Sequence, residues 1–247
     1  MNRLTAILTR MNAGYKERLG DQADDWLRER FRLFERICLP SVKAQTDGGF
    51  AWLLLCDPDT PSWAVQALDD ARSQCPQIVI DFTAHQWGCQ AYQSAPRNAV
   101  IESGADWLMA FRLDNDDAAF DGLVEMLNAQ PCETALYAFD NGYVYEGGMF
   151  WEMDWASSPF LALQTKRPNF ISPLICSHVD SRSSFGEMLG CELPVRKPAN
   201  GARAWIHSRH EANASGDADG MWVKGKPALV ETLQGCGFPW LGQEATA

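Results

Sequence analysis

Short apolar runs alternate with segments of helical spacing along the first half of the chain. The apolar runs span residues 4–9, 50–56, 78–82 and 107–111. The helical segments between them span residues 21–44, 61–71 and 95–103. Strands separated by helices of this length predict right-handed crossovers and a mostly parallel sheet flanked by helices, so the expected fold class is α/β.

The helix expected over residues 21–44 carries one clear apolar stripe. Leu27, Phe31, Phe34 and Cys38 recur at helical spacing, so they fall on one face of that helix. We expect this face to pack in the core. Pro40 should kink or restart the helix, because proline lacks the amide hydrogen that an internal turn needs.

The second half of the chain is less regular. Residues 135–139 and 143–151 resemble strands, and Asp140-Asn141-Gly142 between them is a turn signal. Prolines and glycines break the pattern frequently from Trp155 onward. No linker marks a second domain, so we expect one domain over residues 1–247, with a first half at 1–130, a second half at 131–240 and a flexible tail at 241–247.

Composition narrows the class of protein. The 46% hydrophobic and 21% charged residues are ordinary for a globular chain, and the net charge of −11 argues against a nucleic-acid partner. No apolar stretch is long enough to span a membrane, and no leader peptide is evident at the N-terminus. The eight cysteines include no CxxC pair and are expected as free thiols. We expect a cytoplasmic protein and leave peripheral contact with a membrane open.

The most informative segment is an acidic loop that directly follows the apolar run at 107–111. Asp114, Asp116 and Asp117 place three carboxylates within four residues, and these would repel one another without a cation among them. Mg²⁺ and Mn²⁺ prefer carboxylate and phosphate oxygens, and ligands of parallel sheets bind at the carboxyl ends of strands. A metal-bound diphosphate is therefore expected here. A solvated turn that caps a helix at 120–127 is the alternative, and the residues alone leave both open.

Several strings of residues occur in an order that resembles one known family. They are Thr9-Arg10-Met11-Asn12, Leu33-Phe34, Cys38-Leu39-Pro40-Ser41, Gln45-Thr46, Trp52-Leu53-Leu54-Leu55 with Asp57, Thr60 and Pro61, Arg112-Leu113-Asp114-Asn115-Asp116-Asp117-Ala118, Asn141-Gly142-Tyr143, Pro159-Phe160, and Trp205, His210 and Asn213. This order resembles the rhamnosyltransferases related to glycosyltransferase family 2, over about residues 4–215. The pair Glu211-Ala212 departs from the small glycines of that family.

The resemblance implies an activity and a fold. It implies a Rossmann-like glycosyltransferase fold of the A type, with nucleotide binding in residues 1–130 and acceptor binding in 131–240. The enzyme would use Mn²⁺ or Mg²⁺ to transfer a sugar, rhamnose by the family's name, from a nucleotide-diphosphate donor to a hydroxyl group of a glycan or another acceptor. It also implies the site residues. Those for the nucleotide sugar are Thr9, Arg10, Asn12, Asp57, Arg97, Asn98, Arg112 and Asp114, and those for the metal are Asp114, Asp116 and His210.

The general base stays open at this stage. An inverting transfer needs a carboxylate that takes the proton of the acceptor hydroxyl, and Asp180, Glu187 and Asp154 are the candidates, in that order. Two other functions compete with transfer. One is a module that binds carbohydrate or nucleotide sugar without turnover, and the intact aspartates argue against it. The other is a nucleotidyltransferase, which usually carries a glycine-rich phosphate loop that is missing around residues 9–14.

Overall fold

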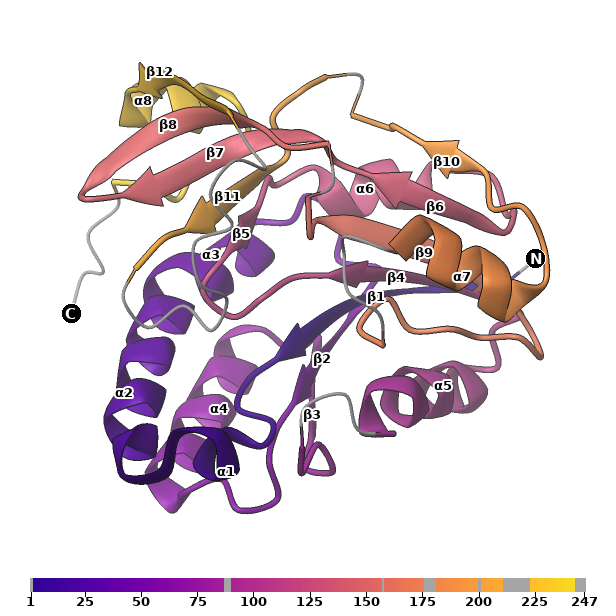
Figure 1. The fold of residues 1–247 in the computed structure, drawn as a ribbon, viewed down its shortest axis with the longest axis horizontal. Helices are drawn as coiled ribbons and strands as arrows, with labels where there is room; N and C mark the ends of the chain where they lie inside the picture. Colours follow the sequence, from indigo (N-terminus) through magenta and orange to yellow (C-terminus); the bar gives the residue numbers. More distant parts are fainter. Residues whose placement is uncertain are drawn as a thin grey trace.

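Two β-sheets and the helices around them organise the chain (Figure 1). A computed structural model describes residues 2–86, 90–156, 158–175, 181–199, 201–210 and 223–242. The first sheet has seven strands in the order β10-β6-β9-β4-β1-β2-β3. The second has five, in the order β12-β8-β7-β11-β5.

The first sheet is built around the four apolar runs. Its strands are β1 (Arg3–Arg10), β2 (Ala51–Leu55), β3 (Ile78–Asp81), β4 (Trp107–Arg112), β6 (Ala135–Ala138), β9 (Leu161–Lys166) and β10 (Val195–Arg196). The ladders β4-β1, β1-β2 and β2-β3 are parallel, as predicted, whereas β9 runs antiparallel to both β4 and β6. The sheet is therefore mixed, and the α/β class is confirmed.

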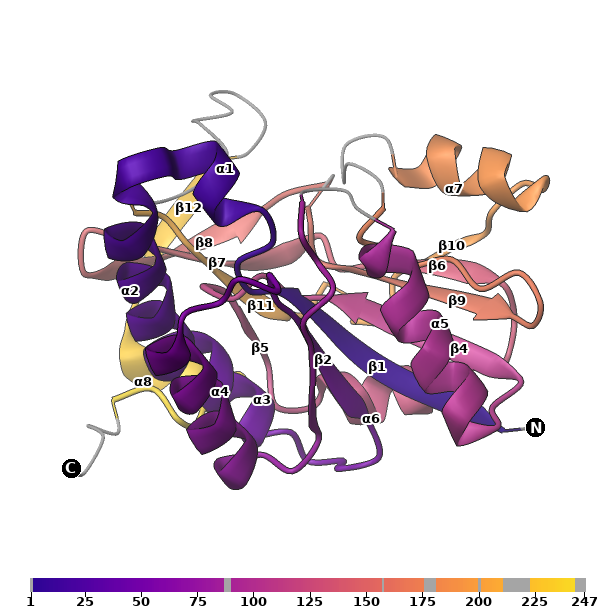
Figure 2. The ribbon, with the colours of Figure 1, turned by 90° about the horizontal axis from the view of Figure 1, so that it is seen from below.

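Helices cover both faces of this sheet (Figure 2). They are α1 (Tyr15–Leu19), α2 (Ala23–Leu33), α3 (Leu39–Lys43), α4 (Ser62–Gln74), α5 (Ala91–Ser103), α6 (Leu123–Asn128) and α7 (Ser181–Leu189), whereas α8 (Val230–Gly235) packs against the second sheet. Successive side chains of β1 point to opposite faces of the sheet and so enter two different hydrophobic cores. Ile7 packs with α2 and α4, whereas Ala6 and Leu8 pack with α5.

The helix predicted over residues 21–44 is divided into pieces. A short 3-10 turn at Gly20–Gln22 precedes α2, and a π-helical turn at Phe34–Cys38 joins α2 to α3, which has Pro40 in its first turn. The wider turn ahead of Pro40 agrees with the predicted kink, because proline cannot donate the hydrogen bond that a continuous helix needs. Leu27, Phe31, Phe34 and Cys38 are all buried, as predicted.

The second sheet corrects two expectations about the second half. Its strands are β5 (Ala118–Ala119), β7 (Asn141–Glu146), β8 (Met149–Asp154), β11 (Trp205–Ser208) and β12 (Val223–Ala228). The turn predicted at 140–142 is wrong, because β7 already begins at Asn141. The turn lies at Gly147-Gly148, where both residues have positive φ, and it divides the strand predicted over 143–151 into β7 and β8.

Gly142 lies within strand β7 and not in a turn, and the reason for a glycine there is the close approach of Trp205. A Cβ atom there would lie 2.1 Å from the ring of Trp205 on β11. The glycine therefore lets the Trp205 indole lie flat against the backbone of β7.

No helix among the described residues is long and apolar enough to cross a membrane. The single domain and its division at residue 130 stay predictions, and residues 243–247 of the predicted tail lie outside the described residues.

Candidate functional site

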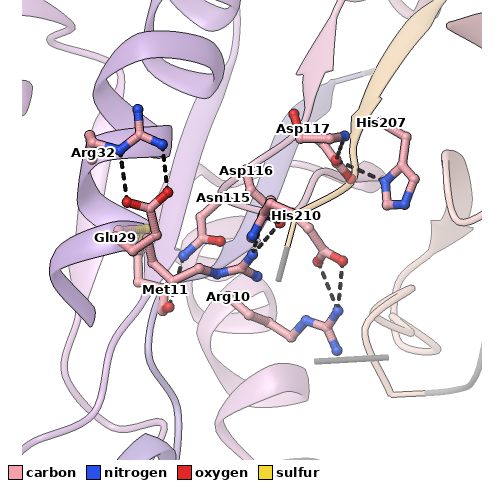
Figure 3. A network of polar contacts seen from close by, with 12 residues as sticks. Arg10, Met11, Glu29, Arg32, Asn115, Asp116, Asp117, His207 and His210 are labelled. Carbon is pink, nitrogen blue, oxygen red and sulfur yellow. Dashed lines mark hydrogen bonds and ion pairs between the residues drawn. The ribbon is translucent and has the colours of Figure 1, made fainter. Parts of the chain in front are cut away.

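The acidic loop lies where the two sheets meet. Strand β4 of the first sheet ends at Arg112, and the chain enters the second sheet at β5 only a few residues later. The loop is fixed to the end of β1, because the Asn115 side-chain amide donates a hydrogen bond of 2.9 Å to the carbonyl of Met11. Asp116 and Asp117 are buried. Figure 3 shows the polar side chains that surround this loop.

Asp114 is held by two arginines that lie at strand ends. Nη2 of Arg10 donates to both carboxylate oxygens, at 2.8 and 3.0 Å, and Nη2 of Arg112 lies 3.3 Å from one of them. Burial alone would raise the pKa of Asp114, but the charges of Arg10 and Arg112 outweigh burial and hold this pKa well below its usual range. Asp114 is therefore ionised.

Asp116 contacts two side chains from distant parts of the chain. Arg30 of α2 forms an ion pair with Oδ2 of Asp116, and Nε2 of His210 lies 2.9 Å from the same oxygen. The two partners are themselves 3.4 Å apart, between Arg30 Nη1 and His210 Nε2. Burial opposes ionisation of Asp116, yet Arg30 and His210 together lower its pKa. Oδ2 of Asp116 thus contacts both a side chain of α2 and a side chain of the segment that follows β11.

Asp117 is bound by strand β11. Its Oδ1 atom accepts hydrogen bonds from His207 Nδ1 and from the Ser208 backbone amide, each at 2.9 Å. Burial raises the pKa of Asp117 to about 6, although His207 acts in the other direction. Burial by itself would lower the pKa of His207, but the nearby Asp117 carboxylate outweighs it and the net pKa is raised. The pair anchors the acidic loop to the second sheet.

An arginine or histidine side chain of the protein itself thus lies beside each of the three carboxylates. Sequence reasoning missed Arg30 and His207 as members of this site. Arg30 follows Leu27 by three positions and so lies within the apolar stripe of α2, where it is 8% exposed. A charged residue in such a stripe needs a buried partner of opposite charge, and this requirement could have indicated Arg30 from the sequence. The sequence indicated His207 less clearly. Its only sign was that His207 lies two positions after Trp205, and so on the same face of a strand as that tryptophan.

The loops after β1 and β2 are joined into one structure. Asn12 donates to Thr60 Oγ1 at 3.0 Å and accepts a hydrogen bond from the Asp57 amide at 3.1 Å. The Asp57 carboxylate in turn accepts a hydrogen bond of 3.0 Å from the amide of Gly14. The structure thus places Arg10, Asn12 and Asp57 at neighbouring carboxyl ends of parallel strands, the edge where ligands of such sheets bind.

Three predicted nucleotide-sugar residues lie elsewhere. Thr9 is fully buried, and its hydroxyl accepts a hydrogen bond of 2.9 Å from Trp52 Nε1, so its side chain belongs to the core. Arg97 and Asn98 are exposed on α5. Within the described part of the chain, no hydrogen bond or ion pair joins either of them to the acidic loop. Their predicted positions at the helix preceding the loop are correct, but their side chains face solvent.

The candidate bases are also separated from the acidic loop. Glu187 is exposed on α7, which Figures 1 and 2 place at the opposite end of the molecule from α2. Asp154 ends β8 and accepts hydrogen bonds from Asn141 at 2.8 Å and Arg203 at 3.0 Å. The Asn141 bond and the Arg203 charge lower the pKa of Asp154, which makes it a weaker base. Asp180 lies outside the described residues, as does Asn213.

The predicted metal ligands meet only in part. Among the described residues, no group of three or more histidine, cysteine, aspartate and glutamate side chains could hold a metal ion. Asp116 and His210 do converge, with an oxygen and a nitrogen 2.9 Å apart, and both atom types suit Mn²⁺. Asp114 has Arg10 on both of its oxygens instead. The described residues thus offer two converging ligands, and a bound diphosphate could supply others.

Comparison with known proteins settles the family. A family model described as "Putative rhamnosyl transferase" matches residues 12–169, well over half of the chain. The chain belongs to this family. The predicted resemblance to rhamnosyltransferases is thereby confirmed. A search of curated proteins found no match to the sequence.

Similar solved structures include nucleotide-sugar enzymes. The S. aureus TarS fragment 1–349 in complex with UDP is 9% identical, with a TM-score of 0.49 over 83% of this chain and 60% of that one. The same fragment with UDP-GlcNAc is 11% identical, with a TM-score of 0.49 over 88% and 62%. A "putative nucleotide-diphospho-sugar transferase" from Desulfovibrio desulfuricans G20 is 10% identical, with a TM-score of 0.40 over 84% and 82%. This chain therefore spans about three-fifths of the TarS fragments.

Proposed function

We propose that this protein is a glycosyltransferase, which moves a sugar, rhamnose in line with the family's description, from a nucleotide-diphosphate donor to a hydroxyl group of a saccharide or another acceptor. One observation carries the proposal. Two buried arginines, Arg30 and Arg112, and the partly buried Arg10 converge on Asp114 and Asp116 at the carboxyl ends of parallel strands. Guanidinium groups at such an edge suit a ligand with a diphosphate.

Different residues of the site would contact different parts of the donor. Asn12 and Asp57 tie together the two loops beside which the base and ribose would lie, and Arg10 and Arg112 fix the direction of Asp114. Negative charge develops on the diphosphate as the bond between the sugar and the phosphate oxygen breaks. Preorganised positive groups stabilise that charge without reorganising at the moment of reaction. Arg10 and Arg112, which are held in place by Asp114, meet that requirement.

We further propose that a divalent ion, Mn²⁺ or Mg²⁺, takes part. Asp116 and His210 would hold it, because their converging oxygen and nitrogen atoms are the donors such ions accept. When bound, the ion would act as a Lewis acid on the leaving diphosphate. Asp180 remains the proposed base for the acceptor hydroxyl, since α7, which carries Glu187, lies at the far end of the molecule from α2 (Figures 1 and 2) and the lowered pKa of Asp154 makes it a weak base.

Titration calorimetry with a panel of nucleoside diphosphates tests this function. We expect the wild-type protein to bind at least one of UDP, dTDP and GDP more tightly with Mn²⁺ than without it. Asp116→Asn should abolish the Mn²⁺-dependent gain, because the amide cannot replace a charged ligand. Asp69→Asn is the matched control, since Asp69 is an exposed aspartate of α4 that pairs with Arg72. Unchanged Mn²⁺-dependent binding in Asp116→Asn would overturn the metal assignment, and no binding by the wild type would overturn the donor class.

A further inference from the structure

Arg30 holds the carboxylate oxygen that the proposed metal would need. Its guanidinium is in contact with Oδ2 of Asp116, and this is the oxygen that lies 2.9 Å from His210 Nε2. The guanidinium is also 3.4 Å from that histidine nitrogen. Arg30 therefore lies at the point where an ion shared by Asp116 and His210 would bind.

Two cations cannot share this oxygen without cost. A divalent ion and a guanidinium at the same atom repel each other strongly in a buried place, where the effective dielectric is low. We propose that Arg30 competes with the divalent ion for Asp116 and turns to the diphosphate when the donor binds, so that metal and nucleotide bind strongly only together. This inference rests on the proposed function of the site.

The surroundings of Arg30 favour a movement of this kind. The Cζ atom of Arg30 lies 5.3 Å from the centre of the Trp26 ring, and that ring is stacked on Tyr15. A flat aromatic surface attracts a planar guanidinium without fixing it at one angle. The Nε atom of Arg30 is buried and has no hydrogen-bond partner in the described part of the chain. A phosphate oxygen would supply the acceptor that this donor lacks.

A second arginine adds to the positive charge on this side. The Cζ atom of Arg18 lies 5.4 Å from the same Trp26 ring. Burial lowers the pKa of Arg18, and the like charge of Arg30 lowers it further. The two guanidinium groups thus lie at the same ring, and their like charges repel each other. A diphosphate would relieve their repulsion, whereas a metal ion alone would increase it.

The affinity for Mn²⁺ in the absence of nucleotide tests whether Arg30 competes with the ion for Asp116, and distinguishes this role from other roles of Arg30. The experiment measures the affinity of the whole protein for Mn²⁺ by electron paramagnetic resonance, and its affinity for UDP and dTDP by calorimetry. In Arg30→Gln we expect Mn²⁺ alone to bind at least tenfold more tightly than in the wild type, while UDP or dTDP binds at least tenfold more weakly. Arg32→Gln is the control, because Arg32 is an exposed arginine of the same helix that pairs with Glu29 (Figure 3).

Arg30→Lys keeps the inference testable if Arg30→Gln does not fold. Lysine retains the charge but not the planar fork, so Mn²⁺ alone should bind about as weakly as in the wild type while the nucleotide affinity still falls. An Mn²⁺ affinity of Arg30→Gln equal to that of the wild type would overturn the competition, as would nucleotide binding that needs Arg30 but not Mn²⁺. A wild-type protein that binds no nucleoside diphosphate would instead overturn the proposed function itself.

Discussion

Asp117 accepts two hydrogen bonds from strand β11 through a single oxygen, one from the His207 ring and one from the Ser208 amide. The loop after β4 is thereby joined to a strand that begins 88 positions after Asp117 in the sequence. The rings of Trp155 and Phe160 lie beside His207, at 5.8 and 6.3 Å between centroids. The pair is thus a polar connection set within an aromatic cluster.

Asp117→Asn should lower the pKa of His207. The raised pKa of the imidazole depends on the Asp117 charge, and without that charge the effect of burial, which disfavours the imidazolium, is no longer opposed. A titration of the histidine ring protons by NMR measures this. His85 is an exposed histidine and serves as the internal control, since its titration should not change. A His207 titration that stays in place would contradict the assigned partnership.

Acid should destabilise the protein partly through Asp114. The folded-state pKa of Asp114 is lowered, so its stabilising contribution is present above its unfolded pKa of about 4 and is lost as the pH falls below that value. Asp114→Asn removes this term. Urea unfolding between pH 5 and pH 3 should then give a free energy of unfolding that falls less steeply in the variant, by up to about 1.4 kcal/mol per pH unit. Parallel curves for the two proteins would show that Asp114 is not the group responsible.

His210→Ala should reduce turnover much more than stability. Removal of the imidazole leaves Asp116 paired with Arg30, so the carboxylate is not left unpaired and the free energy of unfolding should fall by only about 1 kcal/mol. If His210 holds the metal, kcat/KM should fall by at least about tenfold. His85→Ala is the matched control. A variant with near-normal turnover would exclude His210 from the metal site.

Gly142→Ala should destabilise the fold by about 1–3 kcal/mol or more, as expected for overpacking. The added methyl group would lie 2.1 Å from the Trp205 ring, and this ring is held by a hydrogen bond of 2.7 Å to the Phe139 carbonyl and by stacking on Phe160. Gly235→Ala is the control, because its methyl group would meet nothing within 4 Å. Urea unfolding compares the two variants. Equal stability would mean that Trp205 can move away from β7.

Local patterns were sufficient to predict the strands and helices of the first sheet. The run at 107–111 forms β4, all of whose residues are buried, because a strand covered on both faces must be apolar throughout. Pro61 caps α4, which begins at Ser62 close to the predicted start. The later strands were harder to predict. Asn141 and Gly142 have turn chemistry, and only the approach of Trp205 from β11 explains why a strand needs glycine there.

The site could be predicted from the sequence only on its acidic side. Asp114, Asp116 and Asp117 are adjacent in the sequence, so their mutual repulsion could be anticipated from the residues alone. Their partners Arg10, Arg30 and His207 come from three separate elements, and no local spacing links them to the loop. We expected an added cation to neutralise the loop, whereas the tertiary structure places side-chain cations beside each carboxylate. Whether a metal joins them stays a proposal.

The origins of these partners also set an order in time. Arg10 and Arg30 precede the acidic loop, whereas His207 and His210 follow their aspartates by 90 and 94 residues. Chains are synthesised from the N-terminus, and their early segments begin to fold first. On the ribosome, the loop can therefore pair with its arginines while the histidines are still untranslated. A nascent chain of this protein would therefore contain the arginines of the proposed donor site well before His210, the proposed metal ligand, is synthesised.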